Sequence, residues 1–143
     1  MRIANLLLIA GLVTGLSGCV TTYVHPANTP LAKLNLEGTT GYNSVPKSIC
    51  VDGTEKALKP DSTGYSDIPA GRKLTVVFNY SNQGAFGSQV CKAFSSFYPE
   101  PGKSYVTVVE RDAFRCRGLI FLEDSSKKTG LSFEPSIAPG EKC

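Results

Sequence analysis

The chain has 143 residues, of which 15 are Lys or Arg and 12 are Asp or Glu, so its net charge at neutral pH is only +3. Nucleic-acid binding needs a continuous basic stripe, which this sequence lacks. The densest basic groups are Arg72-Lys73, Lys127-Lys128 and the trio Arg111, Arg115 and Arg117. Composition and charge therefore exclude a nucleic-acid partner.

The first 18 residues have the pattern of a secretory signal segment. Arg2 supplies a positive start, residues 6–13 form an apolar stretch, and Gly15, Ser17 and Gly18 are the small residues that a signal peptidase needs before its cut. The apolar stretch is shorter than the ~20 residues of a transmembrane helix. We expect residues 1–18 to be removed, which leaves 125 of the 143 residues, enough for one domain with its own core.

The tetrad Leu16-Ser17-Gly18-Cys19 resembles the lipobox of bacterial lipoproteins. In that family the Cys thiol takes a diacylglycerol, the chain is cut just before the Cys, and the freed amine is acylated. The resemblance implies that Cys19 is the lipidated first residue of the mature protein and that its acyl chains hold the protein on a membrane. An Asp after the Cys would resemble an inner-membrane retention signal of enteric-type bacteria, so Val20 favours the outer membrane, with the domain facing the periplasm.

Residues 19–30 are expected to form the lipidated Cys and a tether, and residues 31–143 the folded domain. The stretch 20–30 contains two prolines and no periodicity, and fully extended it would span at most about 35 Å. The single histidine of the chain, His25, lies here beside Pro26. We interpret His25 as a solvated linker residue rather than as a ligand or base.

From residue 31 the sequence predicts β-structure, with almost no helix signal. Short strands are expected over residues 31–36, 48–51, 73–80, 88–97, 104–110, 115–122 and 131–134. Asp52-Gly53 is a hairpin-type turn dipeptide. The strands over 88–97, 104–110 and 115–122 are expected to be neighbours in one meander.

This pattern predicts an all-β fold, an antiparallel β-sandwich or a small barrel. The segments Pro69-Ala70-Gly71 and Pro101-Gly102, each followed by a β-branched run, resemble the strand entries of transthyretin-like and immunoglobulin-like domains. The resemblance implies a sandwich of one of these two kinds.

Four cysteines follow Cys19, namely Cys50, Cys91, Cys116 and Cys143, and an even number in an exported chain predicts two disulfides. The meander would place Cys91 and Cys116 two strands apart, roughly 9 to 10 Å, beyond the reach of about 7 Å that a disulfide allows. This disfavours the 91–116 pair and with it 50–143. Pairing of Cys50 with Cys91 and of Cys116 with Cys143 is preferred because the second bond ties down the C-terminal tail. Pairing of 50 with 116 and of 91 with 143 remains the alternative.

No catalytic, metal or cofactor site is predicted. A Ser-His-Asp hydrolase needs an imidazole inside the domain, and no histidine follows His25. The cysteine spacings are long and contain no CxxC pair, which argues against a metal site. The adjacent residues Glu123 and Asp124 would point to opposite faces of a strand end, so we interpret them as a solvated turn rather than a calcium site.

The polar stretch over residues 81–87 is expected to be a loop, and Phe86 is its candidate contact residue. Phe86 lies between Gly84 and Gly87, so its ring either covers the core or is displayed to a partner. We expect an outer-membrane-anchored, non-enzymatic lipoprotein that acts as a binding or assembly module, with another envelope protein as partner. By analogy with transthyretin-like domains in lipoproteins of secretion machines, the 81–87 loop is the candidate partner site.

Two alternatives remain open. The segment Ile49-Cys50-Val51-Asp52-Gly53 resembles the Cys-x-x-Gly opening of small lipoproteins that inhibit lysozyme. That resemblance implies a lipoprotein inhibitor of lysozyme-type muramidases. The other alternative is an enzyme of unrecognised type.

Overall fold

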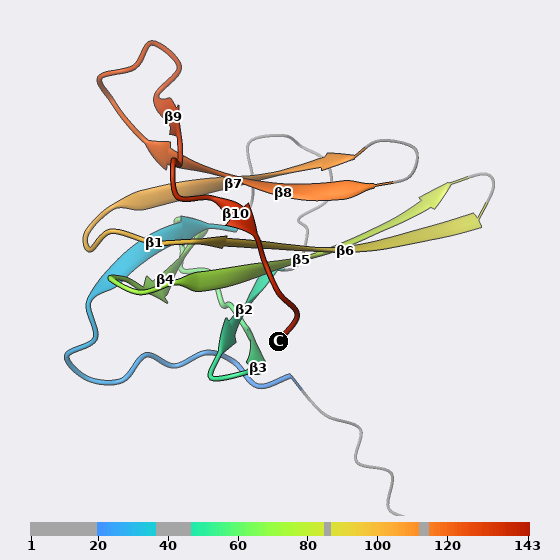
Figure 1. Ribbon diagram of the computed structural model, residues 1–143, viewed down its shortest axis with the longest axis horizontal. Helices are drawn as coiled ribbons and strands as arrows, with labels where there is room; N and C mark the ends of the chain where they lie inside the picture. The colour runs from blue at the N-terminus through green and yellow to red at the C-terminus, as the bar shows by residue number, and fades with distance from the viewer. Residues whose placement is uncertain (1–19, 37–46, 85–86, 112–114) are drawn as a thin grey trace, which may run out of the picture.

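A computed structural model describes residues 20–36, 47–84, 87–111 and 115–143 of the chain, and Figure 1 shows their arrangement. The described residues form ten strands in two five-stranded sheets that pack together as a β-sandwich. The first sheet has the order β4 (Tyr65–Pro69), β1 (Leu31–Asn35), β7 (Ser104–Arg111), β8 (Cys116–Glu123), β9 (Leu131–Phe133). The second sheet has the order β10 (Ala138–Pro139), β6 (Gly87–Phe97), β5 (Leu74–Gly84), β2 (Lys47–Val51), β3 (Thr54–Ala57). Over these residues there is no helix long and apolar enough to cross a membrane.

The predicted all-β sandwich is confirmed, but the expectation of purely antiparallel sheets is wrong for the first sheet. Strand β1 pairs with β4 in antiparallel fashion and with β7 in parallel, in the register Lys33↔Ser104 to Asn35↔Val106. The chain between β1 and β7 supplies β2 and β3 to the second sheet, β4 to the first sheet, and then β5 and β6 to the second. Nothing in the alternation of apolar residues within β1 specifies the direction of the strand that will lie beside it.

The turn predicted at Asp52-Gly53 is confirmed, because it joins β2 to β3 with Val51 opposite Thr54. Asp52 has φ 50° and Gly53 has φ 72°, and two successive positive φ values are typical of the type I′ turn that matches strand twist. The expected loop over residues 81–87 is largely wrong. Strands β5 and β6 stay paired as far as Gly84↔Gly87, so only residues 85 and 86 connect them.

The predicted meander is confirmed where β7 and β8 pair in antiparallel fashion, but it is wrong for β6, which belongs to the second sheet whereas β7 and β8 belong to the first. The connection after β6 crosses between the layers instead of turning within one of them. It contains Gly102 with φ 74° and is fastened by the Glu100 N–H, which donates to the Tyr105 hydroxyl at 2.9 Å. On either side of this crossing the rings of Phe97 and Tyr105 meet edge to face, with centroids 5.0 Å apart.

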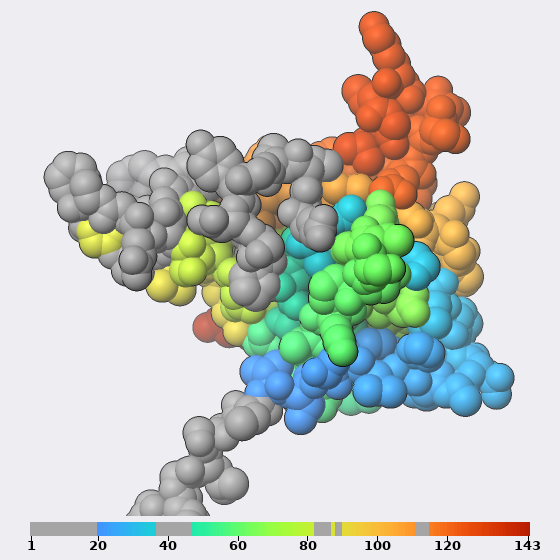
Figure 2. All heavy atoms as spheres, turned by 180° about the vertical axis from the view of Figure 1, so that it is seen from behind, coloured from blue at the N-terminus to red at the C-terminus, as the bar shows by residue number. Residues whose placement is uncertain are grey.

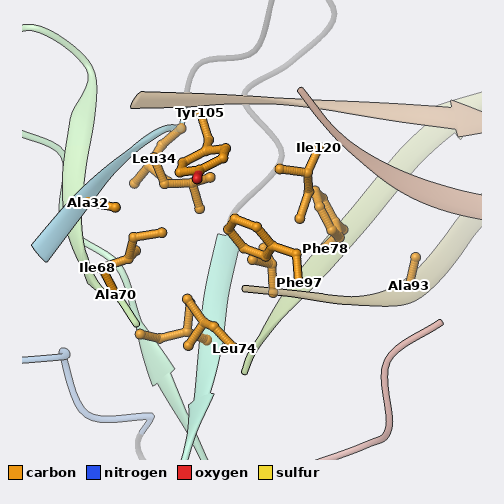
Figure 3. Close-up of a cluster of buried hydrophobic side chains, with 13 residues drawn as sticks. Ala32, Leu34, Ile68, Ala70, Leu74, Phe78, Ala93, Phe97, Tyr105 and Ile120 are labelled. Atoms are coloured by element: carbon orange, nitrogen blue, oxygen red, sulfur yellow. The ribbon is translucent and has the colours of Figure 1, made fainter. Parts of the chain in front are cut away.

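The core lies between the sheets and is built from the inward-facing positions of both (Figure 3). In β5 the alternating residues Leu74, Val76 and Phe78 join the core cluster, as the two-residue period of a strand requires, and Val77 on the other face is also fully buried. The buried cluster contains Ala32, Leu34, Leu36, Ile49, Ile68, Ala70, Leu74, Val76, Phe78, Ala93, Phe97, Tyr105 and Ile120.

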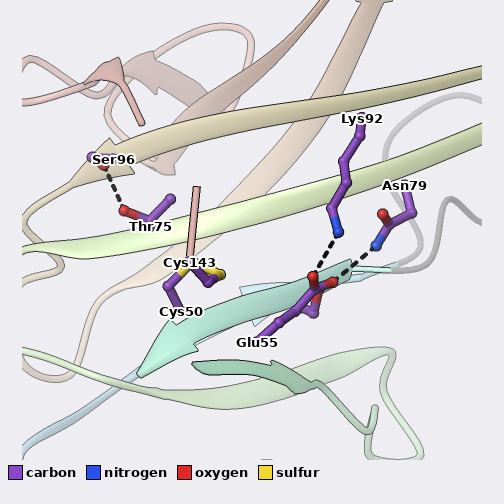
Figure 4. Close-up of a disulfide and its surroundings, with 8 residues drawn as sticks. Cys50, Glu55, Thr75, Asn79, Lys92, Ser96 and Cys143 are labelled. Atoms are coloured by element: carbon purple, nitrogen blue, oxygen red, sulfur yellow. Dashed lines mark hydrogen bonds and ion pairs between the residues drawn. A yellow bond between two sulfur atoms is a disulfide. The ribbon is translucent and has the colours of Figure 1, made fainter. Parts of the chain in front are cut away.

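The two disulfides join Cys50 to Cys143 and Cys91 to Cys116, with Cα atoms 5.4 Å and 6.3 Å apart. The preferred pairing of 50 with 91 and 116 with 143 is therefore wrong, and so is the alternative. The distance argument failed because β6 and β8 are not two strands apart in one sheet. They meet across the sandwich, where Cys91 on β6 reaches Cys116 on β8 directly. The C-terminal tail instead crosses the second sheet to β2, where Cys143 meets Cys50 (Figure 4).

Part of the segment expected to be a tether lies against the domain. Thr22 forms a parallel bridge with Ala57 at the end of β3. The Ala57 N–H donates to the Thr21 carbonyl at 2.9 Å, and the Tyr23 N–H donates to the Ala57 carbonyl at 2.8 Å. The half-buried Tyr23 side chain packs against the core cluster. Residues 21–23 thus extend the edge of the second sheet beyond β3.

Candidate functional site

Of the residues singled out from the sequence, Cys19 and Phe86 lie outside the described residues. Gly84 and Gly87 face each other as the last pair of the β5–β6 hairpin. Gly87 has φ 114°, a conformation that side-chain-bearing residues rarely adopt, so glycine is required there. The candidate loop is thereby narrowed to Ala85 and Phe86 at the end of a long two-stranded arm.

The acidic residues considered from the sequence each have a partner of their own. Glu123 accepts a hydrogen bond from the Tyr65 hydroxyl. Asp124 accepts from the Ser126 hydroxyl at 2.6 Å and from the Ser126 N–H at 3.0 Å, and these bonds lower the pKa of Asp124. His25 is exposed. Across the described ranges, no group of three His, Cys, Asp or Glu side chains could hold a metal ion.

A groove of about 1000 Å³ lies beside β6, and we call it the β6–β8 groove. It is bounded by β6, by β8 and by the C-terminal tail over residues 137–140. Its lining residues are Lys92, Ala93, Phe94, Ser95, Glu110, Arg115, Cys116, Arg117, Gly118, Leu119, Phe133, Ile137, Ala138, Pro139 and Gly140.

Two contacts hold β8 against β6, and three of the residues that make them, Ser95, Cys116 and Gly118, line the groove. The first is the Cys91–Cys116 disulfide. The second is the buried hydroxyl of Ser95, which donates to the Gly118 carbonyl at 2.7 Å. The Gly118 carbonyl faces away from β7, and the hydrogen bond from Ser95 satisfies it. This position of β8 is therefore not open to a further strand. The groove therefore runs along a rigid seam between the two sheets.

The edge of β6 is covered over only a small part of its length. Strand β10 pairs with β6 through Ala138↔Ser96 and Pro139↔Ser95, and the Gly140 N–H then donates to the Phe94 carbonyl at 3.0 Å. Beyond Gly140 the tail leaves the edge and runs to Cys50. Proline in β10 is compatible with this position, because an outermost strand needs no donor on its outer side.

The remaining part of the β6 edge is open in the described structure. The Gly140 contact shows that the backbone of Phe94 points away from β5. Because successive residues in an antiparallel pair point alternately toward and away from a given neighbour, the backbone groups of Lys92 and Val90 point outward as well. No described strand pairs with them. The Val90 side chain beside them is 78% exposed.

Charged side chains line part of the groove. Its lining contains three cationic side chains and one carboxylate. Arg117 pairs with that carboxylate, Glu110, at 2.6 Å, and Lys92 pairs with Glu55 outside the groove at 2.6 Å. Burial acts to raise the pKa of Glu55, but hydrogen bonds from Lys92, Ser48 and Asn79 hold the pKa below its usual value (Figure 4). Glu55 is thus a stable counter-ion that fixes Lys92 at the groove rim.

Most of the other lining residues are apolar. The Lys92 ammonium lies 5.8 Å from the centre of the Phe94 ring. Phe133 is 56% exposed and meets Phe121 edge to face at 5.9 Å. Ile137 packs against the core from the tail side. The site can therefore offer a binding segment unpaired backbone groups and an apolar surface.

Sequence reasoning missed this groove, because its walls come from β6, β8 and the tail, which are distant in sequence. One local signal pointed toward it: Ala138-Pro139-Gly140 is a sequence that suits an outermost strand and its end. Comparisons with known proteins add no family assignment, since no protein family, curated protein or solved structure matches the chain.

Proposed function

We propose that this chain is a lipid-anchored envelope protein that binds an extended segment of another envelope protein along the open edge of β6. The observation that carries the proposal is the row of outward-pointing backbone groups at Val90 and Lys92 beside the β6–β8 groove. An extended peptide that adds to such an edge gains backbone hydrogen bonds, and alternate side chains enter the neighbouring groove.

The groove also indicates the chemistry of the segment. The exposed ring of Phe133 and the half-buried ring of Phe94 favour an apolar residue beside them. The predicted contact residue Phe86 lies in the two-residue connection at the end of the same edge, so a long partner segment could reach it as well.

The anchor part of the proposal rests on Leu16-Ser17-Gly18-Cys19 and on Val20. In this proposal the protein is held at the outer membrane with its domain in the periplasm. The two disulfides suit an oxidising compartment. No catalytic step is part of the proposal. The membrane, through the acyl chains, and an envelope protein are the two partners.

Val90→Pro tests the edge directly. Proline removes the outward N–H of Val90 but leaves the β5–β6 hydrogen bonds in place, because that N–H does not face β5. We expect roughly tenfold weaker capture of the partner from crosslinked envelopes, since one backbone hydrogen bond is lost and the ring obstructs a neighbouring strand. Val90→Thr is the matched control, because it removes the exposed apolar side chain and keeps the N–H.

Both variants should have nearly the same melting temperature as the native protein. If Val90→Pro and Val90→Thr capture the partner equally well, binding along the β6 edge is excluded. In the captured complex, hydrogen exchange should show protection of the Val90 and Lys92 amides. Capture of a muramidase without this protection would favour the inhibitor alternative instead.

A further inference from the structure

The N-terminal segment is attached to the domain almost from its first residue. Thr21 already accepts a hydrogen bond from the Ala57 N–H, and Thr22 bridges to the same residue. Only Val20 separates Thr21 from Cys19. Two residue steps span at most about 7 Å, so a lipidated Cys19 could not stand far from the end of β3.

We propose that the edge formed by residues 20–24 and β3 lies directly on the lipid bilayer surface, so that the domain is seated on the membrane rather than suspended from it. This inference rests on the proposed lipid anchor at Cys19. The sequence suggested a flexible linker of about 35 Å between the lipid and the domain. Because the attachment point is hydrogen-bonded to the sheet, the domain instead has a fixed orientation relative to the membrane.

The side chains along this edge suit a lipid surface. Val20 and Val24 are 55% and 80% exposed. Exposure of these apolar side chains to water is unfavourable, whereas the boundary between headgroups and acyl chains can bury them. The Lys56 ammonium donates to the Thr21 hydroxyl at 2.8 Å and so lies beside the attachment point. Burial raises the pKa of Tyr23, and the positive charge of Arg72 opposes that rise, which places Arg72 near the same segment.

These two cations are available to anionic headgroups. In the described part of the chain, neither Lys56 nor Arg72 belongs to an ion pair. The carboxylate next along β3, Glu55, is engaged by Lys92. Cations close to an anionic bilayer are attracted to it within a Debye length.

The opposite end of the molecule is then the part farthest from the membrane. Figures 1 and 2 show the N-terminal segment along one side of the domain, and β9 with the turn before it projecting at the other side. Lys128 lies in that turn and is exposed. A probe at Val24 and a probe at Lys128 should therefore report very different distances from the lipid.

The chain contains no Trp, so one introduced Trp is a unique fluorophore. We would purify full-length Val24→Trp and Lys128→Trp proteins from membranes and reconstitute them in vesicles of phosphatidylethanolamine and phosphatidylglycerol. Spin-labelled lipids with the nitroxide near the headgroup would quench any Trp at the surface. We expect a loss of fluorescence and a blue shift for Val24→Trp, and neither for Lys128→Trp.

Mass spectrometry of the N-terminal peptide separates the possible failures. With an acyl mass on Cys19, equal quenching of the two variants, or stronger quenching of Lys128→Trp, overturns the seated orientation and leaves the anchor intact. Without an acyl mass, the proposed anchor fails and the orientation fails with it.

A second set of variants tests whether Lys56 and Arg72 contribute to membrane contact. In the Val24→Trp background, Lys56→Gln with Arg72→Gln should reduce the quenching in vesicles containing phosphatidylglycerol, whereas Lys128→Gln should not. In vesicles of phosphatidylcholine alone, the reduction should disappear. Equal quenching in all of these variants would contradict the contribution of Lys56 and Arg72.

Discussion

Lys47 is a buried cation at the start of β2. It is only 7% exposed, and its ammonium donates to the Leu36 carbonyl. Within the described ranges no carboxylate forms an ion pair with it. Burial lowers the pKa of Lys47 from 10.5 to about 8, because the charged form loses its hydration.

This shift predicts a pH dependence of the free energy of unfolding. Below pH 8 both states are protonated, and the folded state bears the full cost of the buried charge. Between pH 8 and 10.5 the unfolded chain holds more protons, so stability rises with pH, by about 3 kcal/mol in total. In Lys47→Met this rise should be missing from urea unfolding curves measured across the same range.

The comparison of slopes is the decisive measurement, because Met also removes the donor to the Leu36 carbonyl and so changes stability at every pH. Lys128→Met, at an exposed position, is the control and should keep the native slope. A native slope in Lys47→Met would show that Lys47 is not the group responsible.

At the scale of the elements, β8 fits over β5 only because position 118 has no side chain. A Cβ atom at Gly118 would overlap the ring of Phe78, which is fully buried and cannot move aside. The Ser95 hydrogen bond to the Gly118 carbonyl depends on the same close approach. The two sheets therefore approach closely at Gly118, beside the groove.

Gly118→Ala should lower the free energy of unfolding by about 1 to 3 kcal/mol, as expected when an atom is forced into a filled core. Phe78→Leu makes room at the same place. The penalty of Gly118→Ala, measured by urea unfolding, should therefore be smaller in the Phe78→Leu background. Equal penalties in the two backgrounds would mean that the Phe78 ring is not what excludes a side chain at position 118.

At the scale of the whole molecule, the two disulfides constrain different parts of the fold. Cys91–Cys116 joins the sheets across a sequence separation of 25 residues, whereas Cys50–Cys143 fastens the tail across a separation of 93. Loss of the second bond frees the tail residues that form one wall of the β6–β8 groove.

Peptide mapping without reduction should find the pairs 50–143 and 91–116. By the chain-entropy relation, removing Cys50–Cys143 with Cys50→Ser and Cys143→Ser should cost about 4 to 5 kcal/mol, and removing Cys91–Cys116 should cost about 3 to 4 kcal/mol. Thermal melts of the two double variants would rank them. A map with 50–91 or 116–143 would contradict the arrangement of β6 and β8 in facing sheets.

The sequence by itself determined the local features. The local pattern over residues 73–80 predicted a strand, and Asp52-Gly53 predicted a hairpin turn. The even number of cysteines predicted that all four form disulfides. Each of these rests on neighbours in the chain or on simple counting, so no knowledge of distant contacts was needed.

Only the tertiary structure decided which strand lies beside which. Alternation shows that one face of a strand is buried, but it does not show which sheet the strand joins or which way its neighbour runs. The disulfide pairing and the parallel position of β1 depend on that choice, and so does the β6–β8 groove. The polar residues after Tyr80 also paired as strand, because an antiparallel ladder satisfies backbone groups whatever the side chains are. Backbone pairing between distant segments therefore placed the candidate site, and local sequence pattern could not.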